Sequence, residues 1–485
     1  MGFTALDYLV LMAYLALSAT VGTLLGRGQK NLEDYFLAGK NMPWWAISFS
    51  IVATETSTLT FIGAPAIAYS GDLTFLQVVI GYFFGRLLVS FILIPGYFRG
   101  NLQTAYEVLD SRFGASVRNL SALLFQVTRA LSDGVRLFAT ALVLSVVTDL
   151  SDIWTVALIG TATIIYTFYG GMKAVIWNDV AQLFIYITGA LLAFSIALQG
   201  VPGGWSEVVA TASAAGTFRL LDFTLSLRVA YTFWAGLLGG AFLTFATHGT
   251  DQMMVQRYLA CGNSRCSQIA LIISGVFVFL QFLLFLLMGV ILFAFYQHFP
   301  LAQEPGQVDR IFPIFIVEQM PPGISGLIIA AIFAAAMSTL SSSLNSLASS
   351  SVNDFYKTYL ARNASDAHYL KASRLATLFW GFLLIAISML ARNWGELLQA
   401  GLTITSVTMG SVLGVFLLGT WTAHTGQRAA LAGMISGLLV TLGIHFSGAV
   451  AWTWYVLIGT AITFLVGGVF PSRGRARNST QMNAE

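Results

Sequence analysis

The sequence predicts an all-α protein that crosses a lipid membrane many times. Of its 485 residues, 57% are hydrophobic and only 9% are charged, and the mean hydropathy is +0.78. Soluble domains carry about 25% charged residues, so this chain cannot cover its surface against water. A bilayer offers no partner for backbone N–H and C=O groups, and apolar stretches of this length satisfy them as helices.

Thirteen apolar stretches of roughly 20 residues or more, long enough to cross a bilayer, follow one another along the chain. The first lacks the basic region and small-residue cleavage site of a signal peptide, so we expect it to remain as a span. The expected helices lie at 5–26, 44–69, 73–97, 119–148, 152–170, 178–200, 228–255, 266–297, 324–352, 371–391, 396–422, 428–446 and 450–470.

The basic residues predict the orientation. An odd number of spans places the two ends of the chain on opposite sides of the membrane. With the N-terminus outside, the cytoplasmic loops hold 17 of the 24 Lys and Arg residues, Arg257 among them, and the outer loops hold four. Because loops rich in Lys and Arg stay in the cytoplasm, we expect N-out, C-in, with a cytoplasmic tail at 471–485.

The span at 324–352 ends in a dense run of hydroxyl side chains. Eight of the thirteen residues from Ser338 to Ser350 are Ser or Thr. On a helix, Ala335, Ser338, Thr339 and Ser342 share one face, and Ser341 lies on a neighbouring face. Such oxygen dipoles suit a small monovalent cation. The alternative is close helix packing, which also uses Ser and Thr.

A second polar segment interrupts the span at 44–69. From Thr54 to Thr60, five of seven residues are Ser or Thr, with Glu55 among them and Gly63 and Pro65 following. These residues are poor helix formers, and a broken span exposes carbonyls to a cation and N–H groups to an anion. The alternative is a helix that is only kinked.

A third segment places charges inside the membrane. Arg129, Asp133 and Arg136 follow one another at helical spacing on one face. Charges at this depth are costly and predict function. One reading is an internal ion-pair ladder, but Asp133 neutralises only one arginine and leaves a guanidinium for Glu55, water or an anionic substrate. Arg86 is a weaker candidate that pairs or extends its head group towards the interface.

Asp179 opens the span at 178–200, where an acid in the first helical turn is common. Asp179 lies in the cytoplasmic half of its predicted span, and Ser341 and Ser342 lie in the cytoplasmic half of the span at 324–352. We therefore expect the three residues at the same depth in the membrane. A carboxylate and two hydroxyls at matching depth would hold a cation. His248 and Asp251 read as a polar helix cap, and Cys261 and Cys266 as inert thiols rather than a redox pair.

Six short motifs occur between about residues 5 and 425. They are "AAAMSTLSSSLNS", "YGGMKAVIWNDVAQ", "TDQMMVQRYLA", "TAYEVLDSRFG", "DRIFPIFI" and "NDFYK". Together they resemble the sodium:solute symporter family, and most of all its bacterial sialic-acid-type members. The resemblance implies a LeuT-type fold, with a leading helix at 5–26, inverted five-helix repeats at 44–200 and 228–422, and two trailing helices at 428–470.

The resemblance also implies two sodium sites and a solute site. The first sodium site would use the carbonyls of Ala53, Thr56 and Ala335 and the hydroxyls of Ser338 and Thr339. The second would use Asp179, Ser338, Ser341 and Ser342. The solute would contact Glu55, Ser57, Thr60, Phe75, Arg129 and Arg136, with Arg129 binding a carboxylate.

Two positions depart from the sialic-acid pattern. Glu55 replaces a neutral hydroxyl residue, and Val79 replaces a glutamine that contacts sugar. We therefore expect a smaller carboxylate or a zwitterion, with its amine towards Glu55.

The predicted function is sodium-driven import of a small organic solute by alternating access. Each inward sodium ion adds about 2.3 kcal/mol per 100 mV of membrane potential to its concentration gradient. We expect a monomer in the plasma (inner) membrane, with Na⁺ as coupling ion, no other cofactor, no nucleic-acid partner and no enzymatic activity. The alternatives are a sodium–sugar symporter, a proton-coupled symporter with Glu55 as carrier, and a transporter-derived channel or sensor.

Overall fold

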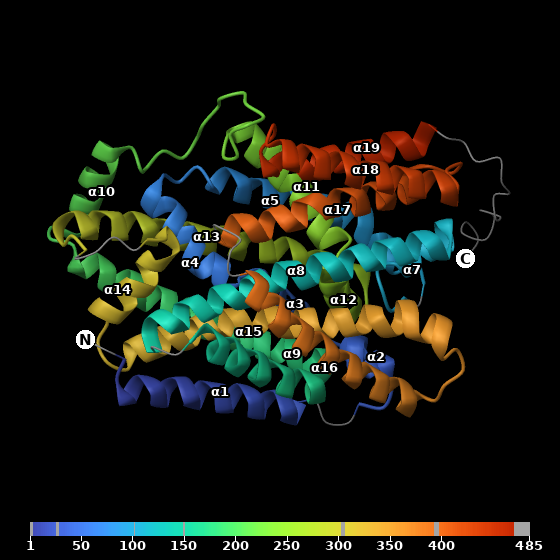
Figure 1. The fold of residues 1–485 in the computed structure, drawn as a ribbon, viewed down its shortest axis with the longest axis horizontal. Coiled ribbons are helices and arrows are strands. Elements are labelled where there is room, and N and C mark those ends of the chain that lie inside the picture. Colours follow the sequence, from blue (N-terminus) through green and yellow to red (C-terminus); the bar gives the residue numbers. More distant parts are fainter. Residues whose placement is uncertain are drawn as a thin grey trace.

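Most of the long helices run roughly along one common axis (Figure 1). The computed structural model describes residues 3–25, 29–100, 102–148, 151–301, 306–391 and 397–469. Helix α1 begins at one end of the long axis and α19 ends towards the other (Figure 1). The predicted tail at 471–485 lies outside the described residues.

The helices have the following bounds, with η marking 3₁₀ and π segments. They are α1 Ala5–Leu25, α2 Leu32–Leu37, η1 Ala38–Lys40, α3 Trp44–Glu55, α4 Thr58–Ser70, α5 Leu76–Leu88, η2 Val89–Leu93, α6 Ile94–Tyr97, α7 Glu107–Phe113, α8 Ala115–Thr148, α9 Asp152–Gly200, α10 Gly204–Ala215, η3 Ala235–Gly239, α11 Gly240–Gly249, α12 Gln252–Ala260, α13 Ser264–His298, η4 Val308–Arg310, α14 Ile311–Gln319, α15 Ile324–Ser350, η5 Ser351–Leu360, α16 Asp366–Leu390, α17 Leu397–Trp421, α18 Gln427–Ser447, η7 Trp452–Trp454 and α19 Tyr455–Val469.

Nine helices in the described part of the chain are long and apolar enough to cross a membrane, or ten if the bent pair α3 and α4 is one span. The expected spans at 152–170 and 178–200 join in α9, which turns at Gly171. Gly171 has φ 56°, and a Cβ there would lie 2.6 Å from the Tyr35 carbonyl oxygen, so only glycine fits. The expected span at 228–255 is divided into η3, α11 and α12.

Helices α3 and α4 meet at an angle of 60° and form the broken span that the sequence predicts. The break falls at Thr56 and Ser57, both of which have extended backbone angles. A hydroxyl-rich run without strong helix formers gives the backbone alternatives to helical hydrogen bonds. The prediction of an interrupted helix in this segment is therefore confirmed.

Helix α15 lies in the middle of the bundle, where it packs against α9, α1, α8, α16 and α3. Nearly all its side chains are buried, including every Ser and Thr from Ser338 to Ser350. Asp7 of α1 secures its N-terminus, since one carboxylate oxygen accepts from the backbone N–H of Gly323 at 2.7 Å and of Gly326 at 2.8 Å. The hydroxyl run thus faces protein on all sides.

Candidate functional site

The end of α3 and the middle of α15 share a cluster of uncharged oxygens. The Ser338 hydroxyl donates to the Ala53 carbonyl at 2.8 Å and lies 3.0 Å from the Ala335 carbonyl. The Thr339 hydroxyl donates to the Thr54 carbonyl at 3.0 Å and lies 3.3 Å from the Ala335 carbonyl. The last carbonyls of a helix lack partners within it. The break in the span therefore presents the α3 carbonyls to the α15 hydroxyls.

Thr56 closes the end of α3 beside this cluster. Its backbone N–H donates to the Val52 carbonyl at 3.0 Å and its hydroxyl to the same carbonyl at 2.8 Å. The Gln281 side-chain amide of α13 donates to the Thr56 hydroxyl. Four of the five residues predicted for the first sodium site, Ala53, Ala335, Ser338 and Thr339, are thus joined by hydrogen-bond contacts or lie next to a contacting residue, and Thr56 follows at the break.

One turn further along α15, the oxygens include a carboxylate. Asp179 of α9 is fully buried and accepts from the Thr54 hydroxyl at 3.3 Å. Thr54 lies 3.1 Å from the Ser342 hydroxyl, so it bridges α9 and α15. Ser341 and Ser342 both donate to the Ser338 carbonyl, at 3.1 and 2.6 Å. The structure therefore joins Asp179 to Ser342 through Thr54, while Ser338 and Ser341 of the predicted second sodium set are linked to Ser342 by bonds within α15.

Arg257 of α12 also belongs to this second cluster. The sequence-based prediction of the cluster did not include this arginine. Its guanidinium donates to Asp179 at 2.9 Å and to Ser342, and its side chain is 1% exposed. The expectation that Arg257 lies in a cytoplasmic loop is wrong, because the chain resumes after a break at Thr250 as α12, whose residues are all buried. The motif "TDQMMVQRYLA" contained the signal, since an arginine inside a family motif points to a specific contact.

A side-chain hydrogen bond at one end of α12 and a disulfide at the other fix the position of this helix. Asp251 accepts from the Met253 backbone N–H at 2.8 Å, which confirms Asp251 as a helix cap. At the other end Cys261 and Cys266 form a disulfide, so the expectation of two inert thiols is wrong. Their Cα atoms lie 5.9 Å apart across the turn into α13. These contacts fix the helix that carries Arg257.

The intramembrane arginines all have carboxylate partners. Asp251 binds Arg129, while Asp133 lies 2.7 Å from Arg136 and 3.7 Å from Arg129. The inference that one guanidinium is left over is therefore wrong, because Asp251 supplies the second carboxylate from a distant part of the sequence. Arg136 is the more accessible of the two, with its side chain 20% exposed against 6% for Arg129.

Glu55 forms a separate cluster at the break. Its carboxylate binds Arg86 of α5 and lies 3.4 Å from the His248 ring. His248 also faces the Arg86 guanidinium at 3.5 Å. The Arg86 side chain is 1% exposed, so Glu55 compensates a buried positive charge.

The remaining predicted solute contacts are apolar or neutral. Ser57 precedes α4 and its carbonyl accepts from the Thr60 backbone N–H at 2.9 Å. Both side chains are buried. Phe75 packs against the rings of Phe282 and Tyr231, with centroids 5.6 and 5.3 Å away.

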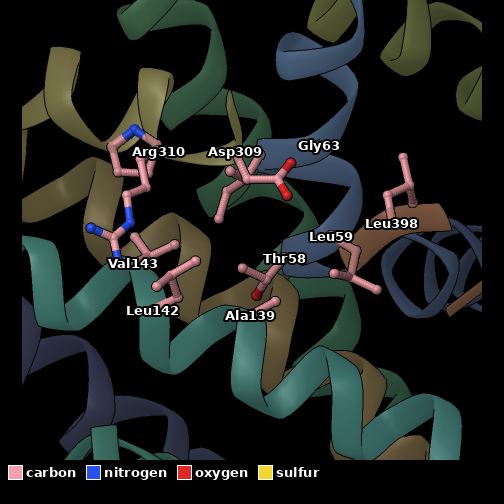
Figure 2. A pocket seen from close by; sticks show the side chains of 11 residues that line it. Thr58, Leu59, Gly63, Ala139, Leu142, Val143, Asp309, Arg310 and Leu398 are labelled. Carbon is pink, nitrogen blue, oxygen red and sulfur yellow. The ribbon is translucent and has the colours of Figure 1, made fainter. Parts of the chain in front are cut away.

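A small pocket lies beside the second half of the broken span, between α4 and α8 (Figure 2). Its floor includes Thr58, which bonds the Thr140 hydroxyl at 2.7 Å, and Thr140 donates to the Arg136 carbonyl at 2.9 Å. The pocket therefore lies one turn of α8 away from Arg136. Side chains of α4, α8, α14, α17 and η4 line it: Thr58, Leu59, Ile62, Gly63, Ala139, Leu142, Val143, Asp309, Arg310, Pro313 and Leu398.

Comparison with known proteins relates this arrangement to sodium transport. The model of the sodium:solute symporter family matches residues 35–437. The sodium/sialic acid symporter NanT of Aliivibrio fischeri is 34% identical over 475 residues, which cover 96% of this chain and 92% of that protein. The human sodium/iodide cotransporter is 31% identical, over 91% of this chain and 70% of that protein. The mouse sodium-coupled monocarboxylate transporter 1 is 29% identical over 91% and 73%.

Solved structures agree with these sequence relatives. A Na⁺-coupled sialic acid symporter in a substrate-bound outward-open state, described as revealing a novel Na⁺ site, has a TM-score of 0.89 and 30% identity. The alignment covers 96% of this chain and 98% of that one. The transporter Mhp1 in a closed conformation has a TM-score of 0.56 at 12% identity, which shows a shared fold alone.

Proposed function

The chain belongs to the sodium:solute symporter family and is a sodium-coupled solute symporter with a LeuT-type fold, and on this premise we propose that it couples two sodium ions to import of a small organic anion. In this proposal the chain crosses the plasma membrane thirteen times, with inverted repeats at 44–200 and 228–422. Its N-terminus lies outside and its C-terminus in the cytoplasm, and it functions as a monomer. Among the alternatives, a proton-coupled mechanism is less favoured, because Arg86 already binds the Glu55 carboxylate.

One observation carries the first sodium site. The helix break exposes two neighbouring carbonyls of α3 to two buried hydroxyls of α15: the Ser338 hydroxyl donates to the Ala53 carbonyl, and the Thr339 hydroxyl donates to the Thr54 carbonyl. Neutral oxygens around one point favour a monovalent cation, because they replace its water without the field that a divalent ion requires. The hydroxyl hydrogens rotate freely, so the same oxygens can turn their lone pairs to an ion.

The experiment combines Ser338→Ala with Thr339→Ala in purified protein. We expect the sodium-dependent rise in melting temperature to fall and sodium-driven uptake into proteoliposomes to stop. Ser346→Ala is the matched control, because Ser346 is buried in the same helix and donates to the Ser343 carbonyl at 3.0 Å. A double variant with ordinary sodium affinity would refute the first site.

A second observation supports the second ion. Asp179 has one carboxylate oxygen, Oδ1, that is buried and has no hydrogen-bond partner among the described residues. A buried carboxylate oxygen without a partner is costly and fits a cation ligand. The proposed set is Asp179, Ser338, Ser341 and Ser342. We expect a sodium Hill coefficient above one, which falls towards one in Asp179→Asn.

The proposed solute is a small organic anion. Relatives are named for sialic acid, iodide and monocarboxylate, which are all anions at neutral pH. Arg136 supports this class, because its side chain is 20% exposed and it lies one turn of α8 from the pocket. Arg129 and Arg136 would bind the carboxylate, while Glu55, Ser57, Thr60 and Phe75 complete the site.

A binding screen tests the solute class. Purified protein is heated with monocarboxylates, iodide, amino acids, sialic acid and neutral sugars, each with and without sodium, because a ligand of the native state raises the melting temperature. We expect stabilisation by a carboxylate only when sodium is present, and none by its amide analogue. Stabilisation by a neutral sugar alone would reject the anion proposal.

A further inference from the structure

Arg257 places a fixed positive charge on the oxygens of the second proposed sodium site. Its Nε donates to the Ser50 hydroxyl at 2.8 Å, and its Nη2 lies 2.9 Å from Asp179 Oδ2. The same Nη2 contacts the hydroxyls of Ser342 and Thr54. Arginine cannot lose its proton in a protein. The guanidinium is therefore a permanent cation held by a carboxylate and three hydroxyls.

A sodium ion at Asp179 Oδ1 would also need the Ser342 hydroxyl, which the Arg257 guanidinium contacts. Asp179 and Ser342 are both proposed ligands of the second sodium ion and contacts of Arg257. The sodium ion and the guanidinium would therefore lie on either side of the same carboxylate. Two like charges at such a distance repel strongly where water is excluded. The two cations therefore compete.

We propose that Arg257 is an internal cation that exchanges with the second sodium ion at Asp179. The proposal rests on the second sodium site proposed above and adds what occupies its oxygens when the ion has left. When sodium binds, the guanidinium releases Asp179 and Ser342. When sodium departs, the guanidinium returns, so the carboxylate is never left as an uncompensated buried charge.

The position of Arg257 gives this exchange a mechanical consequence. Arg257 lies on α12, while its partners lie on three other helices: Ser50 on α3, Asp179 on α9 and Ser342 on α15. Its Nη1 also donates to the Met253 carbonyl at 2.8 Å, so the side chain lies along its own helix. Sodium binding would therefore loosen α12 from α9 and α15, and sodium release would fasten it to them again.

A competing internal cation has a measurable effect on sodium affinity. If an ion binds only when the guanidinium has withdrawn, its apparent dissociation constant is the intrinsic constant divided by the fraction of time that the site is open. If the guanidinium blocks the site nine-tenths of the time, removing it lowers the half-saturating sodium concentration about tenfold.

The experiment measures sodium binding to purified Arg257→Gln by titration of the melting temperature and by binding of radioactive sodium, both at alkaline pH. We expect two ions per protein, as in the wild type, with one of them binding about tenfold more tightly. Added guanidinium ion should compete with this tighter sodium in the variant. Arg112→Gln is the control, because Arg112 lies on α7 and donates to the carbonyls of Thr422 and Thr425.

Unchanged or weakened sodium binding in Arg257→Gln would overturn the proposal, because Arg257 would then be a fixed brace or would position Asp179 for the ion. If Arg257→Gln does not fold, Arg257→Lys keeps the charge without the planar fork. Lysine should hold Asp179 less well and so also tighten sodium binding, and no tightening there would overturn the proposal. Asp179→Asn separates the two claims: if it still binds two ions, the second sodium site itself is wrong.

Discussion

Two neighbouring turns of α15 offer a cation very different surroundings. At Ser338 and Thr339 the oxygens are neutral, and they meet the exposed end of α3. At Ser342 the oxygens lie beside a buried carboxylate that already has a positive partner, Arg257. The first cluster depends on the shape of a broken helix, and the second on a balance of charges. Similar residues in one helix thus produce a site controlled by geometry and a site controlled by competition.

Replacing Ser338, the residue shared by both proposed sites, should have the largest effect. We expect Ser338→Ala to weaken overall sodium binding on the order of 100-fold, because losing a ligand of each ion costs roughly 1.5 kcal/mol twice. Sodium titration of the melting temperature and of uptake measures this. A loss confined to one ion would show that Ser338 serves only one cluster.

Thr339→Ala and Ser342→Ala should separate the clusters, since each hydroxyl belongs to one proposed site. We expect each to raise the half-saturating sodium concentration by about tenfold, or 1.4 kcal/mol. Only Ser342→Ala should bring the Hill coefficient towards one while sodium-driven uptake persists at a lower rate. Identical behaviour of the two variants would mean that the turns do not act separately.

Changing Arg129 or Arg136 to lysine should leave sodium affinity intact and weaken solute binding. Lysine keeps the charge but cannot reproduce a two-point contact with a carboxylate. We expect the solute concentration for half-maximal uptake to rise about tenfold, and more for Arg136→Lys, whose side chain is more exposed. A fall in melting temperature without a change in solute affinity would assign both arginines to ion pairing alone.

Asp7→Asn should have the smallest effect on ion binding, although it touches the same helix. Asp7 also accepts from the Ser325 hydroxyl at 2.6 Å at the start of α15, far from both clusters. Losing the charge at this cap should cost about 1 kcal/mol of stability. Denaturation measures that loss, and sodium affinity should change less than about twofold. A larger change would show that α1 sets the position of the ion ligands.

Much of this comparison was visible in the sequence. The hydroxyl run after Ala335 and the interrupted span near Glu55 follow from local composition, and the structure brings Ala53, Ser338 and Thr339 together. The prediction worked because both signals are local: poor helix formers break a helix, and helical spacing places hydroxyls on one face.

The partners of the buried charges were not visible, because they come from distant segments. Asp251 binds Arg129 across 122 residues of sequence, and Arg257 reaches Asp179 across 78. Hydrophobicity placed Arg257 outside the membrane, since it follows an apolar stretch and is itself charged. In the structure, the helix break at Thr250 is followed by the buried helix α12, which carries Arg257.

The ratio of sodium to solute transported tests the central claim most directly. In proteoliposomes, the membrane potential at which net flux stops, measured at fixed gradients, gives the number of sodium ions per solute. The account predicts two for the wild type and for Thr358→Ala, a control whose hydroxyl bonds the Asn353 carbonyl at 3.1 Å away from both clusters. It predicts one for Asp179→Asn. A wild-type ratio of one would contradict a second coupled ion, and an unchanged ratio in Asp179→Asn would contradict its location.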